Sequence, residues 1–297
     1  MGNTKLINWI IFLALSLVWG SSFILIKAGL TGLSAVHVAS LRVLSAGLVL
    51  VPVVIRNLSV LPAKKLGLTF LSGILGSLFP AYLFCIAETG LDSSTAGVLN
   101  ALTPIFTIII GAFFFRNKVP AIKILGMLIA FAGSVLLYFS HANILPGSNV
   151  LNVLLVVLAT VCYGVNVNLV RQYLNEVPSL IIAAFALVTC ACIALLVLVF
   201  TGYFSLNFRN ADVMWSTVYA SILGIAGTAI ASVFFYMLIK RAGVVFSSMV
   251  TYGIPIIAVG WGLYFGEQVG LKEVGCMLLI LLGVYLANTN KKTTYKT

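Results

Sequence analysis

Long apolar runs recur along this chain from residue 7 to residue 287, and they limit its fold more than any other feature. Each run is close to the roughly 20 residues that a helix needs to cross the hydrocarbon core of a bilayer. Of the 297 residues, 62% are hydrophobic and only 8% are charged, whereas about a quarter of the residues in a soluble domain are charged. A soluble core could not use so much apolar surface, so we expect an all-α membrane protein.

Ten runs of this kind are separated by short connections that carry most of the charge. The first run is longer than the core of a signal peptide and lacks a clear cleavage site, so we expect it to remain as a transmembrane helix. The ten predicted helices cover residues 7–28, 35–54, 66–87, 93–115, 121–138, 151–170, 179–200, 213–238, 246–265 and 272–287.

Basic residues are distributed unevenly between the two ends of these predicted helices. The chain has 17 Lys and Arg residues, and the connections at one end hold most of them, while the other end has only Lys27, Arg209 and Lys272. The positive-inside rule then places the N and C termini in the cytoplasm. This asymmetry and anionic lipid account for the net charge of +11, so we expect the lipid bilayer as a partner and no nucleic acid.

Two pairs of short segments indicate that the chain consists of two similar halves. Trp19-Gly20 in the first predicted helix corresponds to Tyr163-Gly164 in the sixth, and Pro104 in the fourth corresponds to Pro255 in the ninth. Because five helices is an odd number, the second half would enter the membrane from the opposite side. We therefore predict two inverted five-helix repeats over residues 1–140 and 141–297, with a substrate path between them near the middle of the bilayer.

Several segments occur in an order that resembles the drug/metabolite transporter superfamily. They are Trp-Gly-Ser-Ser-Phe at 19–23, Ser-Leu-Arg at 40–42, the proline-containing fourth and ninth helices, and Gly-Glu-Gln at 266–268. The chain is most similar to the EamA-like ten-helix metabolite exporters, over nearly its whole length. The resemblance implies a central cavity formed mainly by helices one, three, four, six, eight and nine, and export of amino acids or related small metabolites. It does not identify the substrate.

Aromatic and neutral polar residues dominate the expected cavity. An amide in hydrocarbon costs several kcal/mol without a partner, so Asn100, Asn166 and Asn168 must face protein, water or ligand. Hydrogen bonding between helices and ligand binding are both open for them, as packing and stacking are for the aromatic residues. The candidate substrate-binding residues are Trp19, Ser22, Phe79, Tyr82, Asn100, Tyr163, Asn166, Tyr252 and Trp261.

Ionisable residues inside the predicted helices are few, and each is a candidate site because intramembrane charge is costly. Arg42 in the second helix either contacts a ligand or gate, or is satisfied by carbonyls and solvent near the helix end. Glu88, which follows the third helix, either takes part in proton coupling or lies in a solvated loop. Pro104 and Pro255 interrupt backbone hydrogen bonding at matched positions, so we expect them to act as gating hinges.

The sequence pattern contains no signature of catalysis. The 5 cysteines lie inside apolar runs without metal-ligand spacing, and the chain has no paired nucleophile and base and no phosphate-binding loop. We therefore expect no enzymatic activity, no cofactor and no metal site.

Inverted halves around an uncharged cavity favour a secondary active transporter that works by alternating access. Its cargo would be a small neutral or zwitterionic metabolite, with exported amino acids, including aromatic ones, as the leading class. The alternative is transport of a quaternary amine such as choline through an aromatic cage of Trp19, Tyr163 and Trp261. We expect a monomer or a weak homo-oligomer in a cell membrane of the bacterial inner-membrane type.

Overall fold

The computed structural model describes residues 2–91, 93–115, 119–141, 150–257 and 270–288. Within these ranges the chain is helical and contains no strand. Seven helices are long and apolar enough to cross a membrane, and the segments Ala121–Leu137, Val244–Ile257 and Val274–Ala287 form three shorter apolar helices. The predictions of an all-α membrane protein and of ten helices are confirmed, while the orientation of the termini stays a prediction.

The elements of the first half follow the first five predicted helices, several of which are divided. In order they are α1 Gly2–Gly29, α2 Ala35–Arg56, α3 Ala63–Gly73, η1 Ile74–Leu78, α4 Phe79–Ala87, α5 Ser93–Asn100, α6 Thr103–Phe113 and α7 Ala121–His141.

The second half repeats this order. Its elements are α8 Val150–Tyr173, α9 Ser179–Phe200, η2 Tyr203–Ser205, α10 Ala211–Ile222, η3 Leu223–Ile230, α11 Ala231–Ala242, α12 Val244–Ser248, η4 Met249–Tyr252 and α14 Leu271–Asn288.

Polar residues in the connections determine where helices begin. The Ser34 hydroxyl accepts a hydrogen bond from the backbone N–H of His37 at 3.2 Å and caps α2. Asn210 caps α10 in the same way, by accepting from the N–H of Asp212 at 2.9 Å. Such caps satisfy N–H groups that have no partner inside the helix.

The third helix of each half contains a π-helical segment. In the first half η1 joins α3 to α4, and in the second half η3 joins α10 to α11. π-Helical turns are rare and occur frequently at functional sites, because the wider turn frees backbone groups and redirects side chains. Neither segment was predicted from the sequence, yet both occupy corresponding places in the two halves.

The fourth helix of each half is interrupted just before a proline. α5 ends at Asn100 and α6 begins at Thr103, so Pro104 lies in the first turn of α6. In the second half α12 is followed by the 3-10 segment η4 and then by a helical stretch over 253–257 that includes Pro255. Proline at the start of a helical segment has no N–H to leave unpaired. The structure thus has breaks in the helix next to Pro104 and Pro255, the two prolines that were predicted to act as gating hinges. Their role in gating stays a prediction.

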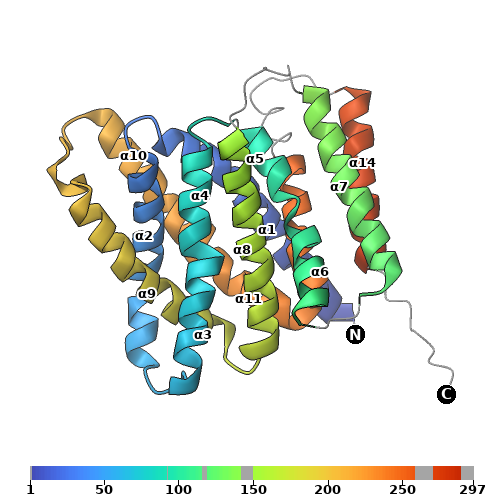
Figure 1. Ribbon diagram of the computed structural model, residues 1–297, viewed down its shortest axis with the longest axis horizontal. Coiled ribbons are helices and arrows are strands. Elements are labelled where there is room, and N and C mark those ends of the chain that lie inside the picture. Colours follow the sequence, from blue (N-terminus) through green and yellow to red (C-terminus); the bar gives the residue numbers. More distant parts are fainter. Residues whose placement is uncertain (1, 92, 116–118, 142–149, 258–269, 289–297) are drawn as a thin grey trace.

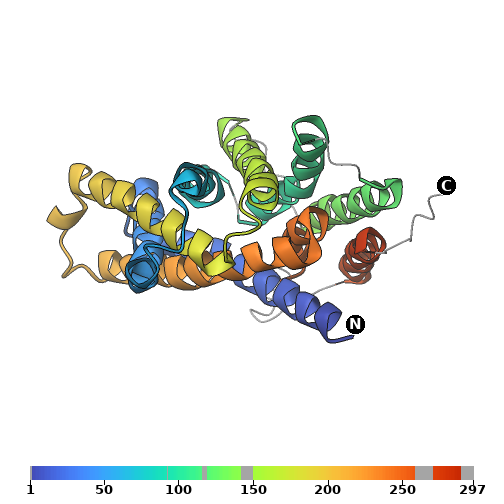
Figure 2. The same ribbon diagram turned by 90° about the horizontal axis from the view of Figure 1, so that it is seen from below.

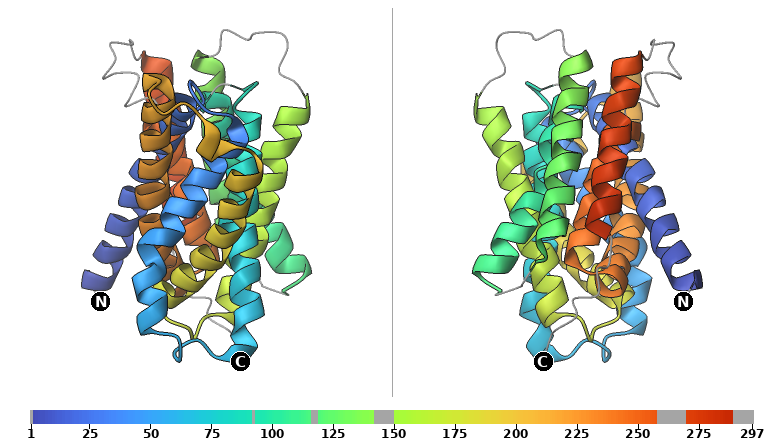
Figure 3. Two further views of the ribbon diagram at one scale, coloured as in Figure 1. Left: turned by 90° about the vertical axis from the view of Figure 1, so that its left-hand side faces the viewer. Right: turned by 90° about the vertical axis from the view of Figure 1, so that its right-hand side faces the viewer.

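The helices form a bundle and are distributed along its longest axis. Figure 2 shows α2, α9 and α10 at one end of the molecule and the pair α7 and α14 at the other. α7 and α14 lie side by side (Figures 1 and 3), and the backbones of Gly126 and Gly283 meet between them without space for a Cβ atom on either. Small residues at such positions permit close helix packing in membranes.

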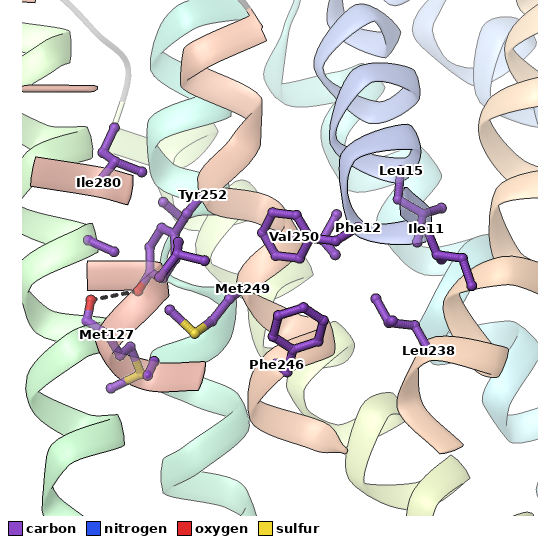
Figure 4. Close-up of a cluster of buried hydrophobic side chains, with 14 of the residues drawn as sticks. Ile11, Phe12, Leu15, Met127, Leu238, Phe246, Met249, Val250, Tyr252 and Ile280 are labelled. Carbon is purple, nitrogen blue, oxygen red and sulfur yellow. Dashed lines mark hydrogen bonds between the residues drawn. The ribbon is translucent and has the colours of Figure 1, made fainter. Parts of the chain in front are cut away.

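A buried apolar cluster joins the two halves where α1 meets α12 and η4 (Figure 4). The rings of Phe12 and Phe246 lie 5.3 Å apart between their centroids. Tyr252 is completely buried beside them, and its hydroxyl donates to the carbonyl oxygen of Met127 in α7 at 3.0 Å. This contact satisfies the only polar group of the tyrosine side chain inside the cluster.

Candidate functional site: a cavity between the two halves

A cavity lies where the interrupted helices of the two halves face each other, and its empty space, including the part open to solvent, is about 790 Å³. Its wall combines α1, α2, η1, α4, α5 and α6 of the first half with α8, η3, α11, α12 and η4 of the second. The predicted site residues that line it are Trp19, Ser22, Arg42, Asn100, Tyr163 and Asn166.

Both π-helical segments contribute to the wall. η1 contributes Gly76 and η3 contributes Gly227 and Thr228. The indole Nε1–H of Trp19 donates to the carbonyl oxygen of Gly227 at 2.9 Å, so α1 is tied directly to η3. A Cβ atom on Gly76 would lie 2.3 Å from Nδ2 of Asn166, so a side chain at this position would displace the amide.

Asn166 is held by a buried network between three helices. The Ser72 hydroxyl of α3 donates to Oδ1 of Asn166 in α8 at 2.6 Å, and its oxygen lies 3.2 Å from the hydroxyl of Tyr236 in α11. These three side chains are buried, and Asn166 and Tyr236 line the cavity. Because the network fixes the amide, Asn166 presents an oriented polar group to the cavity.

Asn100 and Asn168 have different surroundings. Asn100, at the end of α5, accepts a hydrogen bond from the hydroxyl of Thr103 at 3.2 Å, and both residues line the cavity. Asn168 donates instead to the carbonyl oxygens of Thr107 and Gly164, each at 2.9 Å, and borders a separate pocket of about 670 Å³. Asn168 therefore makes one bond between helices, to Thr107 in α6, and one within α8, to Gly164.

Aromatic side chains form the apolar part of the cavity. Tyr163 stacks on Phe84 with centroids 6.2 Å apart and an angle of 25° between the rings. Trp19 meets Phe235 edge to face at 5.0 Å. All four rings line the cavity, which is therefore apolar on these sides and polar near Asn100, Asn166 and Arg42.

Arg42 lies on the cavity wall rather than among solvent or lipid at a helix end. Only 9% of the residue is exposed, and its Nε–H donates to the hydroxyl of Thr228 in η3 at 2.8 Å. Every other side chain that lines the cavity in the described part of the chain is neutral. Arg42 thus supplies the formal charge of this site.

Glu88 is completely buried at the end of α4, which contradicts the solvated-loop interpretation. Its Oε2 accepts from the Ser93 hydroxyl at 3.3 Å, its Oε1 has no hydrogen-bond partner, and its backbone carbonyl accepts from Lys27 Nζ at 2.8 Å. Burial raises the pKa of Glu88 to about 8, although Lys27, the bond from Ser93 and the charge of Arg42 each act to lower it. Glu88 does not line the cavity, and its proton-coupling role stays a prediction.

Three predicted binding residues lie away from the cavity. Phe79 is 52% exposed on the outer surface. The hydroxyl of Tyr82 lies 2.6 Å from that of Ser40, between α4 and α2, and Tyr252 belongs to the apolar cluster of Figure 4. Trp261 lies outside the described residues. The structure therefore brings together five of the nine residues proposed to bind substrate, together with Arg42.

Several residues that build the cavity were not among those predicted from the sequence. Ser72 and Tyr236 are polar residues inside apolar runs, and that position alone could have marked them as partners of a buried amide. Thr228 and Phe84 carry no comparable signal, because hydroxyls can bond within their own helix and aromatic residues commonly pack.

Comparisons with known proteins agree with this architecture. The sequence profile of the EamA-like transporter family matches residues 7–139 and again residues 150–289. An uncharacterized transporter of Archaeoglobus fulgidus is 27% identical over 282 residues, which cover 94% of this chain and 98% of that protein. A probable amino-acid metabolite efflux pump of Escherichia coli is 27% identical over 135 residues, which cover 45% of this chain and 44% of the pump.

A protein of known crystal structure shares the fold. The two structures superpose with a TM-score of 0.72, over 94% of this chain and 96% of the other, at 19% sequence identity. At this identity the similarity supports the arrangement of the helices and nothing about the cargo.

Proposed function

Because the chain belongs to the EamA-like transporter family, we propose that it is a secondary active transporter that exports amino acids or closely related zwitterionic metabolites across the cell membrane. The cargo would occupy the central cavity, and movement of one half against the other would open the cavity to each side in turn. A bacterial inner membrane is the setting that this proposal assumes.

The observation that carries the proposal is the cavity itself. Its wall is mostly apolar and includes a few polar side chains, a composition typical of small-molecule sites. Amide and hydroxyl groups suit the polar end of an amino acid, while the rings of Trp19, Phe84, Tyr163 and Phe235 suit an apolar or aromatic side chain. The printed name of the Escherichia coli relative, a probable amino-acid metabolite efflux pump, supports the same class.

The alternative cargo, a quaternary amine, does not fit this cavity as well. A permanent cation would meet the positive charge of Arg42 in a site of low dielectric, where like charges repel strongly. Amino acids carry a carboxylate beside their ammonium group and do not have this disadvantage. We therefore retain amino acids as the proposed class.

Counterflow into proteoliposomes tests the proposal. Vesicles that contain the purified protein and an unlabelled amino acid should accumulate the labelled form faster than protein-free vesicles. Trp19→Ala and Asn166→Ala should reduce this exchange by about tenfold or more, a loss of about 1.4 kcal/mol in binding, because each removes an oriented group from the cavity. Trp215→Ala and Asn207→Ala, at exposed positions, are the matched controls. If no amino acid among the standard twenty is exchanged, the proposed cargo class is wrong.

A further inference from the structure

Arg42 has an unusual position for a charged residue in a membrane protein. It lies inside α2, is 91% buried, and lines a cavity between the two halves. Among the residues that the structure describes, no Asp or Glu forms an ion pair with it. Glu88 is near enough to be affected by the charge of Arg42 but does not contact the guanidinium group. Charged groups at such depth are normally paired, because an unpaired one is costly to bury.

The hydrogen bonding of Arg42 uses only one edge of its guanidinium group. Nε–H donates to Thr228, and this bond fixes the plane of the group between α2 and η3. Nη1 and Nη2 have no hydrogen-bond partner among the residues that the structure describes. They also retain some accessible surface, because the only fully buried side-chain atom without a partner in these ranges is Glu88 Oε1. Both nitrogen atoms therefore remain available on the side of the cavity.

A guanidinium group with two free, coplanar donors matches the two oxygen atoms of a carboxylate. We infer that Arg42 binds the carboxylate of the transported molecule through Nη1 and Nη2, so that a free carboxylate is required of every cargo. The inference rests on the proposed function and deepens it. Thr228 acts as a positioning residue, because its hydroxyl holds Nε and so directs the two Nη groups into the cavity.

The remaining lining defines what else this site can recognise. An ammonium group would find no carboxylate in the described wall and would meet only neutral oxygen atoms and ring faces, such as those of Asn100 and Tyr163. The carboxylate should therefore contribute more to affinity than the ammonium group. A deaminated acid with the same side chain should still bind, whereas the corresponding amide, ester or amine should bind poorly.

Competition binding on the purified wild-type protein tests this order directly. The protein is first loaded with a labelled amino acid that it exchanges. Three unlabelled competitors are then added in separate experiments: the deaminated acid, the amide and the decarboxylated amine. We expect the amide and the amine to compete at least about 30-fold more weakly than the parent amino acid, as for the loss of a buried charge partner. An amide that competes as well as the parent acid would overturn the assignment of Arg42, while the proposed transport of amino acids would stand.

Similar compounds also identify the case in which the proposed cargo class is wrong but the carboxylate site is correct. If the protein exchanges no amino acid, but its melting temperature rises with simple carboxylates such as 3-phenylpropanoate and not with the matching amide, the carboxylate site stands and the cargo class proposed above is wrong. Specific binding to the folded state raises apparent stability in this way. A protein that neither exchanges amino acids nor is stabilised by a carboxylate contradicts both.

Variants of Arg42 and Thr228 locate the effect. Arg42→Gln should abolish the preference for the acid over the amide, and Arg42→Lys should keep part of it, because the charge remains and the planar fork is lost. Thr228→Val should weaken carboxylate binding less than Arg42→Gln and should leave the preference in place. Arg209→Gln, in the exposed connection before α10, is the control. A normal acid preference in folded Arg42→Gln would refute the role of Arg42.

Discussion

Glu88 ends α4 with a carboxyl group that has no exposed surface and one oxygen without a partner. Burial disfavours the charged form and raises the pKa of this carboxyl group, so it keeps its proton to a higher pH than an exposed glutamate does. In the family setting, a buried acid next to α1 is suited to exchange a proton during transport. That coupling stays a proposal, which unchanged exchange after collapse of the pH gradient would contradict.

The raised pKa of Glu88 predicts how stability depends on pH. Between its ordinary value of 4.5 and the value of about 8 in the fold, the folded protein holds a proton that the unfolded chain releases. The contribution of this group therefore favours folding most below pH 4.5, decreases as the pH rises through this window, and levels off above about pH 8. Glu88→Gln should flatten this part of the curve and should melt at a higher temperature than the wild type at pH 8.

Melting temperatures in detergent at several pH values measure the effect. Glu176→Gln changes an exposed glutamate near the end of α8 and should follow the wild-type curve. Parallel curves for the wild type and Glu88→Gln would mean that the carboxyl group is not held protonated in the folded protein.

At the scale of the helices, η1 depends on the absence of a side chain at Gly76. Gly76→Ala would bring a methyl group onto the amide of Asn166, which Ser72 holds in place. We expect this change to displace the amide and to weaken amino-acid binding by about tenfold, equivalent to about 1.4 kcal/mol. Competition binding with the labelled amino acid is the measurement.

Gly67→Ala provides the control, because Gly67 lies in α3, which continues directly into η1. A Cβ atom on Gly67 has open space around it, and alanine is favoured over glycine in a helix by about 1 kcal/mol. This variant should bind normally and unfold at the wild-type temperature or higher. Equal binding by both alanine variants would show that the Asn166 amide can move aside without loss.

The sequence predicted the depth of residues in the helices better than the direction in which they face. Trp19, Asn100, Tyr163 and Asn166 line the cavity, although their role in binding stays a prediction, and the helices break next to Pro104 and Pro255. Phe79 and Tyr252 were misplaced because lipid-facing and core-facing surfaces are both apolar in a membrane protein, so hydrophobic periodicity gives little information on direction. The π-helical segments were missed because their effect on direction appears only when the chain is folded.

For the whole molecule, hydrogen bonds around the cavity connect the two halves to each other. Trp19 bonds to Gly227, Ser72 to Asn166, and Arg42 to Thr228, each pairing one residue of the first half with one of the second. The alternating access proposed above requires the halves to move relative to each other, so it predicts that some of these bonds break or exchange partners during transport. A carboxylate bound to Arg42 would lie among these contacts and could thus bias that movement.

The orientation of the whole chain in the membrane gives the last prediction. The connection between α2 and α3 and the connection between α9 and α10 lie at opposite ends of the bundle (Figures 1 and 3). The first connection is flanked by Arg56, Lys64 and Lys65, so the positive-inside rule places it in the cytoplasm. Ser59→Cys and Ser205→Cys introduce an exposed thiol into each connection.

A membrane-impermeant maleimide should label Ser205→Cys in intact cells and Ser59→Cys only after the membrane is opened. The unmodified chain, which retains its own five cysteines, supplies the background of the assay. Labelling of Ser59→Cys alone in intact cells would reverse the orientation and place the basic connections outside, against the electrostatic preference that the sequence shows. It would also turn Glu88, which ends α4, toward the cytoplasm, so the side from which a proton reaches this group depends on the same measurement.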